Sequence, residues 1–234
     1  MARTIIVGDV HGCADELSDL LARVAPASDD RIVLVGDLVG RGPAPHRTVE
    51  LARQAGALAV RGNHEDHFLR WRHRGPAPGE RPTDNELRRR EHAAELSDAD
   101  WAYLERLPLW LELPEHDVLV VHAGLVPGVA LTQQSPKVLL SIRCVTDSGE
   151  PSSRRGGRLW GERYVGPPHV LFGHNAREEP QVHRWATGLD TGCVYGGRLT
   201  ALVLEAGCRV PPGERRLTAL VSVPARHPYV PIQS

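Results

Sequence analysis

The sequence lacks the features that mark several classes of protein. No apolar run among its 234 residues approaches the roughly 20 residues of a membrane-spanning helix, so the sequence predicts no membrane partner. Its four cysteines form no Cys-x-x-Cys pair and no dense spacing, which argues against a disulfide scaffold. The apolar run at residues 5–7 meets a charge too soon for a signal peptide. We therefore expect a cytoplasmic protein with reduced thiols.

A surplus of charge of one sign is also missing. The chain has 28 Lys and Arg residues against 29 Asp and Glu residues, a formal net charge of −1 with histidine neutral. This balance gives no global positive field that would recruit nucleic acid or an anionic lipid surface. Hydrophobic residues make up 41% and charged residues 24%, values that exclude disorder and fibrous repeats. Length and composition favour a single domain over residues 1–234 that carries an insertion, with no obligate protein partner evident.

The first third of the chain contains a repeated unit. A short apolar run, a Gly-Asp or Gly-Asn turn and a helical segment follow one another, and the turns begin at Gly8, Gly36 and Gly62. These glycines are 28 and 26 residues apart, about the length of a βαβ unit. The runs before the turns are residues 4–7, 32–35 and 57–60. Because these runs are continuously apolar, we expect an α/β fold with helices on both faces of the sheet.

The pattern changes after residue 65. Arginine is frequent from about 66 to 113, and we interpret this range as a helical insertion with a Gly/Pro-rich loop at 75–82. Ser97 is the expected N-cap of a helix in this range, and Trp101, Tyr103 and Trp110 are expected to form the insertion's own core rather than an adenine platform. Further strands are predicted at 118–121, 169–172, 199–204 and 217–223, and an exposed arm from Pro224 onward.

Polar side chains with metal-ligating chemistry follow five of the predicted strands: Asp9, His11, Asp37, Asn63, His64, His122 and His174. In open α/β sheets the loops at this edge converge from many strands. Carboxylate, imidazole and amide groups without thiolate suit Mn, Fe or Zn in a catalytic site. The ligands exceed what one ion needs, and a bridging aspartate would let them hold two ions about 3.5–4 Å apart, the arrangement used in hydrolytic phosphoryl transfer. A single Gly-Asp after a strand is usually only a turn, so the joint pattern carries the hypothesis.

Taken together, the motifs resemble the calcineurin-like metallophosphoesterase superfamily, in its phosphoprotein-phosphatase branch. They are GDVHG (8–12), GDLVGRG (36–42), GNHE (62–65), HAG (122–124) and GH (173–174). The segments GDLVGRGP, VRGNHE and LDTGCVYGGRLTALVLE (189–205) look like bacterial symmetrical diadenosine tetraphosphatases and their relatives. The resemblance implies a metallophosphoesterase β-sandwich flanked by helices, with the helical insertion near the active site.

The resemblance also implies a role for each ligand. Asp9 and His11 would bind the first ion, and Asp37 would bridge to the second. The second site would be completed by Asn63, His122 and His174. Mn is the expected metal, with Co, Fe, Zn or Mg as alternatives, and two such ions would acidify a bridging water and neutralise charge on the phosphate.

The remaining roles concern the substrate. His64 would act as general acid toward the leaving group, and Arg41 would hold phosphoryl oxygens bidentately. Asn63 would also contact the substrate. Arg143 resembles a position where an arginine meets substrate in the subfamily, and Arg163 is a weaker candidate.

Gly40 is a departure from part of the family. Protein serine/threonine phosphatases carry Asp at this position, and that carboxylate supports the catalytic histidine. The nucleotide-polyphosphate branch usually has a small residue there, so Gly40 argues against a phosphoprotein substrate. It leaves open what orients His64. Asp190 is a candidate for that task, and the alternative is that Asp190 only caps a turn.

The expected reaction is hydrolysis of a phosphoanhydride bond, with symmetrical cleavage of diadenosine tetraphosphate to two ADP. Asymmetrical cleavage to ATP and AMP is typical of hydrolases with an unrelated glutamate-rich motif that this sequence does not contain. The alternatives are a protein serine/threonine phosphatase, and a hydrolase of inorganic polyphosphate or of capped RNA 5′ ends, on the same dinuclear site. A non-catalytic metal-binding regulator would predict a missing ligand or a missing His64, and neither is missing.

Overall fold

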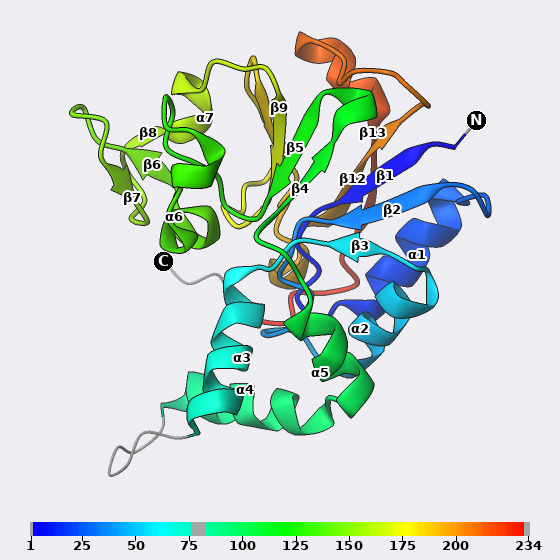
Figure 1. Cartoon of the computed structure of the whole chain (residues 1–234). Coiled ribbons are helices and arrows are strands. Elements are labelled where there is room, and N and C mark those ends of the chain that lie inside the picture. The colour runs from blue at the N-terminus through cyan, green and yellow to red at the C-terminus, as the bar shows by residue number, and fades with distance from the viewer. Residues whose placement is uncertain (1, 76–82, 232–234) are drawn as a thin grey trace.

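Two five-stranded sheets face each other in the computed structural model, which describes residues 2–75 and 83–231 (Figure 1). The first sheet has the order β13 (Leu220–Pro224), β12 (Arg198–Leu204), β1 (Thr4–Val7), β2 (Arg31–Leu34) and β3 (Leu58–Ala59). The second has the order β10 (Gln181–Val182), β11 (Ala186–Gly188), β9 (His169–Phe172), β5 (Val118–Val121) and β4 (Trp110–Leu113). Both are mixed, since β1 pairs parallel with β2 and antiparallel with β12, and β5 pairs parallel with β9 and antiparallel with β4. This is the expected α/β metallophosphoesterase sandwich.

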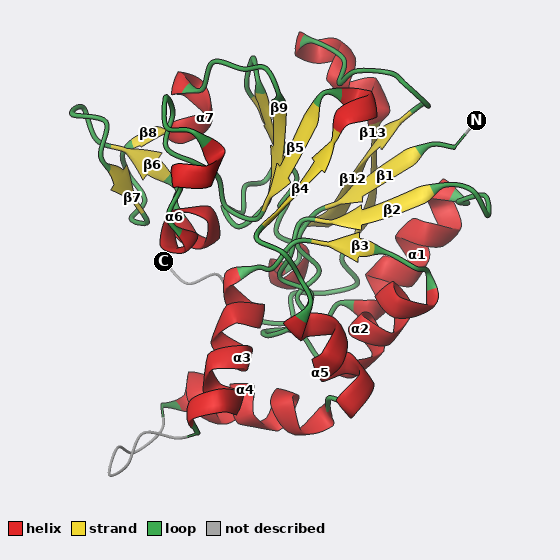
Figure 2. Cartoon of the chain, viewed as in Figure 1, coloured by secondary structure: helices red, strands yellow, loops and turns green. Residues whose placement is uncertain are grey.

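Helices cover the outer faces of the two sheets (Figure 2). The helices are α1 (Ala14–Val24), α2 (Pro45–Gln54), α3 (Asn63–Arg74), α4 (Asp84–Glu95), α5 (Asp98–Glu105), α6 (Pro136–Ser141) and α7 (Trp160–Arg163). Short 3₁₀ turns occupy Pro114–His116, Leu131–Gln133, Cys193–Tyr195 and Gly213–Ala219. A small sheet of β7 (Pro151–Ser152), β6 (Cys144–Val145) and β8 (Arg158–Leu159) lies beside α6 and α7. No helix in the described ranges is long and apolar enough to cross a membrane.

Strand β1 of the first sheet is buried on both faces, but by different partners. In β1, Ile5 and Val7 pack toward α1 and α2, whereas Ile6 packs against Val120 and Leu171 of the second sheet. The prediction that helices cover both faces was therefore wrong for the inner face. A continuously apolar strand has the same pattern whether a helix or a second sheet buries it, so periodicity cannot tell these cases apart. Each such side chain stabilises the fold by roughly 1.5–3 kcal/mol through burial.

Three helices, α3 to α5, occupy most of the range assigned to the insertion, and its edges differ from the prediction. Residues 110–113 form β4, which pairs with β5 over Trp110↔Val121 to Leu113↔Val118. Beyond Gly75, the loop expected at 75–82 lies outside the described residues. Ser97 caps α5 by accepting a hydrogen bond from the amide of Asp100 at 3.2 Å.

The aromatic residues of the insertion pack inward. Trp101 is buried in the core beside Phe68, with 6.4 Å between the ring centroids. The hydroxyl of Tyr103 donates a hydrogen bond to the carbonyl oxygen of Ala57 at 3.0 Å. Trp110 packs against the outer core of the second sheet. Trp101 and Tyr103 therefore form structural contacts, as expected, rather than a platform for adenine.

The tail after β13 was expected to be an exposed arm, and the structure corrects this. The hydroxyl of Tyr229 and the amide of Arg226 both donate to Glu16 Oε1, at 2.8 and 3.0 Å. Val230 is buried against the same core. A buried carboxylate on α1 needs such donors, and the tail supplies them. Residues up to 231 thus lie against the domain.

Candidate active site

The structure gathers the predicted ligands and His64 at one edge of the sandwich. They come from both sheets, because Asp9 and Asp37 follow β1 and β2 while His122 and His174 follow β5 and β9. Asn63 is the first residue of α3. The loops that carry these residues bend sharply, and four non-glycine residues have left-handed backbone: φ is 50° at His11, 50° at Asp37, 69° at Arg41 and 66° at His174. Such strained positions cluster at functional sites.

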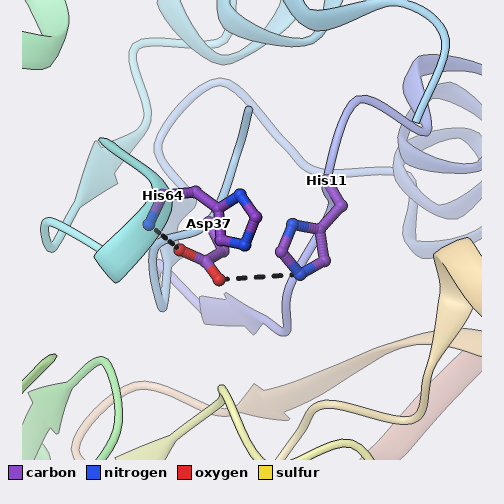
Figure 3. Close-up of side chains that lie close together, drawn as sticks. All are labelled: His11, Asp37 and His64. Carbon is purple, nitrogen blue, oxygen red and sulfur yellow. Dashed lines mark hydrogen bonds and ion pairs between the residues drawn. The ribbon is translucent and has the colours of Figure 1, made fainter. Parts of the chain in front are cut away.

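Asp37 lies between two groups of side chains. Its Oδ2 atom is 3.5 Å from His11 Nε2 and 3.5 Å from His122 Nε2 (Figure 3 shows the His11 side). The first ligand group is Asp9, His11 and Asp37, in which His11 Nε2 lies 3.9 Å from Asp9 Oδ2. The second ligand group is Asp37, Asn63, His122 and His174. The shared position of Asp37 is the geometry that a bridging ligand requires.

Asn63 organises the second ligand group. Its Oδ1 atom is 2.9 Å from His122 Nε2 and 2.8 Å from His174 Nδ1. On the opposite side of the His122 ring, Nδ1 is 2.9 Å from the carbonyl oxygen of Val35. Because a carbonyl oxygen only accepts, Nδ1 holds the ring proton. Metal-binding histidines are usually fixed by this kind of backbone contact.

These contacts give a direct test of whether the residues fit a metal. Burial lowers the pKa of His122, so its ring is neutral and Nε2 presents a lone pair. That lone pair faces Asn63 Oδ1, which also only accepts. His11 has the same arrangement, with Nδ1 at 3.4 Å from the carbonyl oxygen of Val39 and Nε2 toward Asp37. A cation between such facing acceptors removes the conflict, so the donor set fits divalent ions.

The charges at the site lead to the same conclusion. Asp9, Asp37 and Asp190 are all buried, and burial raises the pKa of each, with their mutual repulsion adding to the effect for Asp9 and Asp37. Within residues 2–75 and 83–231, no arginine or lysine forms an ion pair with any of the three. Burying a charged carboxylate without such a partner destabilises the folded state, unless metal ions balance the charge. Two divalent cations would supply that balance.

Glu65 is a functional residue that the sequence analysis left without a role. Its carboxylate accepts hydrogen bonds from the amides of Asp37 (2.8 Å), Val39 (3.1 Å) and Gly62 (2.8 Å). It thereby ties the loop that carries Asp37 to the first turn of α3. Burial, with the charge of Asp37 second, raises the pKa of Glu65 to about 7. The signal was available in part, because a Glu three residues after a helix N-cap can accept from the N-cap amide, which is the half of a capping box that glycine permits.

His64 occupies the space left by Gly40. A Cβ atom on Gly40, whose φ is +81°, would overlap His64 Nδ1. The His64 ring lies 4.7 Å from the His11 ring, and its buried Nδ1 has no hydrogen-bond partner in the part of the chain that the structure describes. Asp190 does not supply one. Its Oδ1 atom accepts from the amide of Gly192 at 3.1 Å, which is the turn-capping role.

The arginines expected near the substrate are placed differently from one another. Arg143 Nη1 donates to the carbonyl oxygen of His174 and to Asn175 Oδ1, both at 3.0 Å, so it is fixed beside the second ligand group. The Arg41 guanidinium lies 5.5 Å from the centre of the Tyr195 ring. Arg163 lies 3.8 Å from the exposed Asp147 and lines neither of the cavities next to the site.

Two cavities are lined by residues that neighbour the ligand groups, and none of the proposed metal ligands is among the described lining residues of either. The insertion-side cavity has a volume of about 200 Å³ and is lined by Arg41, His64, Arg88, Arg89 and His92, with the tail at Val230. The hairpin-side cavity has a volume of about 480 Å³ and is lined by Arg155, Ala176, Arg177, Glu178, Thr191 and Tyr195. A third cavity, of about 730 Å³, is lined by residues near β4, β5 and α7 and contains none of the predicted site residues.

Comparisons with known proteins identify relatives that match over nearly the whole chain. The chain is 30% identical to the asymmetrical bis(5′-nucleosyl)-tetraphosphatase PrpE of Bacillus subtilis, over 96% of this chain and 95% of that protein. It is 29% identical to the protein of the same name from a Geobacillus species, over 97% and 96%. A crystal structure described as a candidate diadenosine tetraphosphatase aligns with a TM-score of 0.80 at 34% identity, over 96% of this chain and 94% of that one.

A protein serine/threonine phosphatase from Saccharomyces cerevisiae shares the fold alone, with a TM-score of 0.57 at 16% identity, over 96% of this chain and 79% of that one. The family model for calcineurin-like phosphoesterases matches residues 2–203, a range that contains both ligand groups and His64. The chain therefore belongs to the calcineurin-like phosphoesterase family.

Proposed function

We propose that this protein hydrolyses a phosphoanhydride bond of diadenosine tetraphosphate with the help of two divalent metal ions, Mn being the first choice. The observation that carries the proposal is the position of Asp37 between two ligand groups, with His64 at their edge. The names of full-length relatives point to the same substrate. Bound ions would lower the pKa of a water molecule and neutralise charge on the phosphate.

The position of cleavage is proposed to be asymmetrical, giving ATP and AMP. The sequence analysis predicted two ADP, partly because the chain lacks a glutamate-rich motif. Relatives that match over nearly the whole chain are named asymmetrical, so the absence of that motif is no argument for symmetrical cleavage. The register of the substrate against the ions decides the product, and that register depends on residues outside the shared motifs.

The chain's own residues have separate tasks in this reaction. Arg41 and Arg143 hold phosphoryl oxygens beside the ligand groups. His64 gives a proton to the bridging oxygen as its bond to phosphorus breaks. Glu65 holds the loop that carries Asp37 in a fixed position relative to the start of α3. Water adds one oxygen to the attacked phosphorus, and no covalent enzyme intermediate is needed.

Gly40 supports a nucleotide substrate over a phosphoprotein. Protein phosphatases of this family carry Asp at this position, but here even a Cβ atom would overlap the His64 ring. The chain thus has a different arrangement around its general acid. Hydrolysis of RNA caps or of inorganic polyphosphate would use the same ions, so only a comparison of substrates separates these reactions from the proposed one.

The test is a substrate panel with identified products. Diadenosine tetraphosphate, tripolyphosphate, a capped RNA, a phosphopeptide and an aryl phosphate are each incubated with the protein and Mn, Mg, Co or Zn. We expect the highest kcat/KM on diadenosine tetraphosphate, with ATP and AMP as early products. A higher value on the phosphopeptide, the capped RNA or tripolyphosphate would overturn the proposed substrate. ADP as the sole early nucleotide product, with no AMP, would overturn the proposed asymmetrical cleavage.

A further inference from the structure

The two cavities beside the ligand groups differ in charge. The insertion-side cavity is lined by three arginines, Arg41, Arg88 and Arg89, and no carboxylate is among its described lining residues. The hairpin-side cavity has Arg155 and Arg177, and Glu178 among its lining residues offsets part of their charge. A polyphosphate chain carries several negative charges, whereas a nucleoside monophosphate carries few. The insertion side therefore fits the more highly charged part of the substrate.

The cavities also differ in size and in the groups they offer. The volume of the hairpin-side cavity, about 480 Å³, lies within the roughly 300–1,000 Å³ of typical small-molecule sites, and that of the insertion-side cavity, about 200 Å³, does not. The hairpin side contains Tyr195, whose ring already has the Arg41 guanidinium 5.5 Å from its centre. An aromatic ring beside a cation is a common platform for a nucleobase.

The hairpin-side cavity is continuous with the metal ligands along the chain. Ala176 comes two residues after His174, and Thr191 directly follows the buried Asp190. A nucleoside bound in this cavity would therefore lie on the side of the ligand groups where His174 and Asp190 are found.

The insertion-side arginines lie near the general acid. His64 lines the same cavity as Arg88 and Arg89. Burial lowers the pKa of Arg89, while the charge of Glu86 opposes this effect and that of Arg41 adds to it. His64 Nδ1 and His92 Nδ1 are buried without a hydrogen-bond partner in the described ranges. Polar groups of this kind are suited to phosphate oxygens that arrive with a ligand.

From these observations we infer that the substrate binds in one orientation: the adenosine of the attacked phosphorus lies in the hairpin-side cavity, and the departing triphosphate lies along Arg88 and Arg89. The inference rests on the proposed function. Water attacks the α-phosphorus of the first adenosine, and a new P–O bond forms there. The bond from that phosphorus to the bridging oxygen breaks, and the electron pair stays with the oxygen. His64 gives this oxygen a proton, the water proton goes to solvent, and the products are AMP and ATP.

Hydrolysis in ¹⁸O-labelled water tests the orientation with the unmodified protein. Mass spectrometry of the products in single-turnover conditions is expected to find the label in AMP and none in ATP. Label in the terminal phosphate of ATP would mean attack on the β-phosphorus and would overturn the inference while leaving the proposed function intact. Two ADP would overturn the orientation and the asymmetrical register together. Absence of any hydrolysis would be a failure of the proposed function itself.

A pair of variants tests the assignment of the insertion-side cavity. Arg88→Gln removes one of its guanidiniums, and we expect the inhibition constant of ATP to rise about tenfold, while that of AMP stays within about twofold. Arg90→Gln is the matched control, since Arg90 is on the same helix but does not line the insertion-side cavity. It lines a neighbouring cavity beside Phe68 and Trp71, which Arg89 also borders. Tyr195→Leu should show the opposite selectivity and raise the inhibition constant of AMP more than that of ATP. Equal weakening of both nucleotides by Arg88→Gln, or the same effect from Arg90→Gln, would overturn the assignment.

Discussion

The backbone amide of His64 donates a hydrogen bond to Asp37 Oδ1 over 2.9 Å, while Asp37 Oδ2 faces His11 (Figure 3). The same Oδ2 atom also faces His122 of the second ligand group. One carboxylate thus fixes the start of α3 and stands between the two proposed metal positions. The same side chain would therefore position both the proposed general acid and the proposed metal ions.

Asp37→Asn is expected to lower metal content and activity together. The wild-type protein should hold two ions per chain, and the variant fewer than one, because the amide group cannot bridge two cations. Replacing a residue that only orients a metal ligand typically lowers metal affinity or activity about 10–100-fold. Replacing a ligand shared by two ions should lower them at least as much. Elemental analysis and kcat/KM measure the two effects. Asp147→Asn, at a fully exposed side chain, is the control. Two retained ions in Asp37→Asn would contradict the bridging role.

His64→Asn should keep both ions and lose roughly 10²–10⁴-fold in kcat on a phosphoanhydride. The loss should be smaller on an aryl phosphate whose leaving group departs without a proton. The exposed His73, on the same helix, provides the matched variant His73→Asn, which is expected to behave as wild type. His64 lies within the same cluster of possible ligands as His11 and Asp37, so metal content must be measured alongside. Equal losses on the two substrates would rule out general acid catalysis.

Gly40→Asp and Gly40→Ala should both weaken hydrolysis of diadenosine tetraphosphate, and by similar factors. The sequence alone suggests repulsion of a polyanion by the added carboxylate, but the overlap with His64 begins at Cβ. Gly56→Ala separates this contact from backbone strain, because Gly56 also has a positive φ of 60° and nothing within 4 Å of its Cβ position. It should lose roughly 1–2 kcal/mol of stability and no activity. An alanine variant as active as wild type would assign the effect to charge.

The contribution of Glu65 to the stability of the metal-free protein should fall as pH rises between about 4.5 and 7. Buried histidines with lowered pKa values, His122 among them, act in the opposite direction, so this contribution is read as the difference between the wild-type protein and Glu65→Gln. Burial raises the pKa of Glu65 from 4.5 to about 7 in the folded chain, so the folded state binds the proton more tightly than the unfolded state. The stabilisation is complete below the unfolded value and is lost as pH rises through the folded value. Denaturant unfolding after chelation measures the slope.

Glu65→Gln should remove this contribution, because its side chain does not ionise. Glu91→Gln, at an exposed position on α4, should leave the slope unchanged. A slope in Glu65→Gln equal to that of the wild-type protein would contradict the assignment. Added Mn²⁺ should raise stability most at the upper end of the window, where the carboxylates are ionised.

The grouping of the candidate ligands at one edge could be predicted from sequence because each belongs to a short strand-and-turn pattern. Asp9 and Asp37 follow apolar runs directly, so locating the strand end locates the ligand. The partner on the inner face of β1 could not be predicted, since burial by a helix and by a sheet leaves the same apolar pattern. The contact between Gly40 and His64, and the wall that Arg41 and Arg88 share, join residues far apart in sequence. Such proximity follows from tertiary packing and has no local signal.

The left-handed backbone at His11, Asp37, Arg41 and His174 has a consequence for engineering. Each of these residues holds a conformation that glycine or asparagine would adopt at lower cost. Glycine at such positions would relax the loops and remove the side chains that the reaction needs. Selection for heat resistance and selection for turnover therefore act in opposite directions on these four positions. Substitutions that raise thermal stability are best sought in the apolar cores between each sheet and its helices, away from the candidate active site.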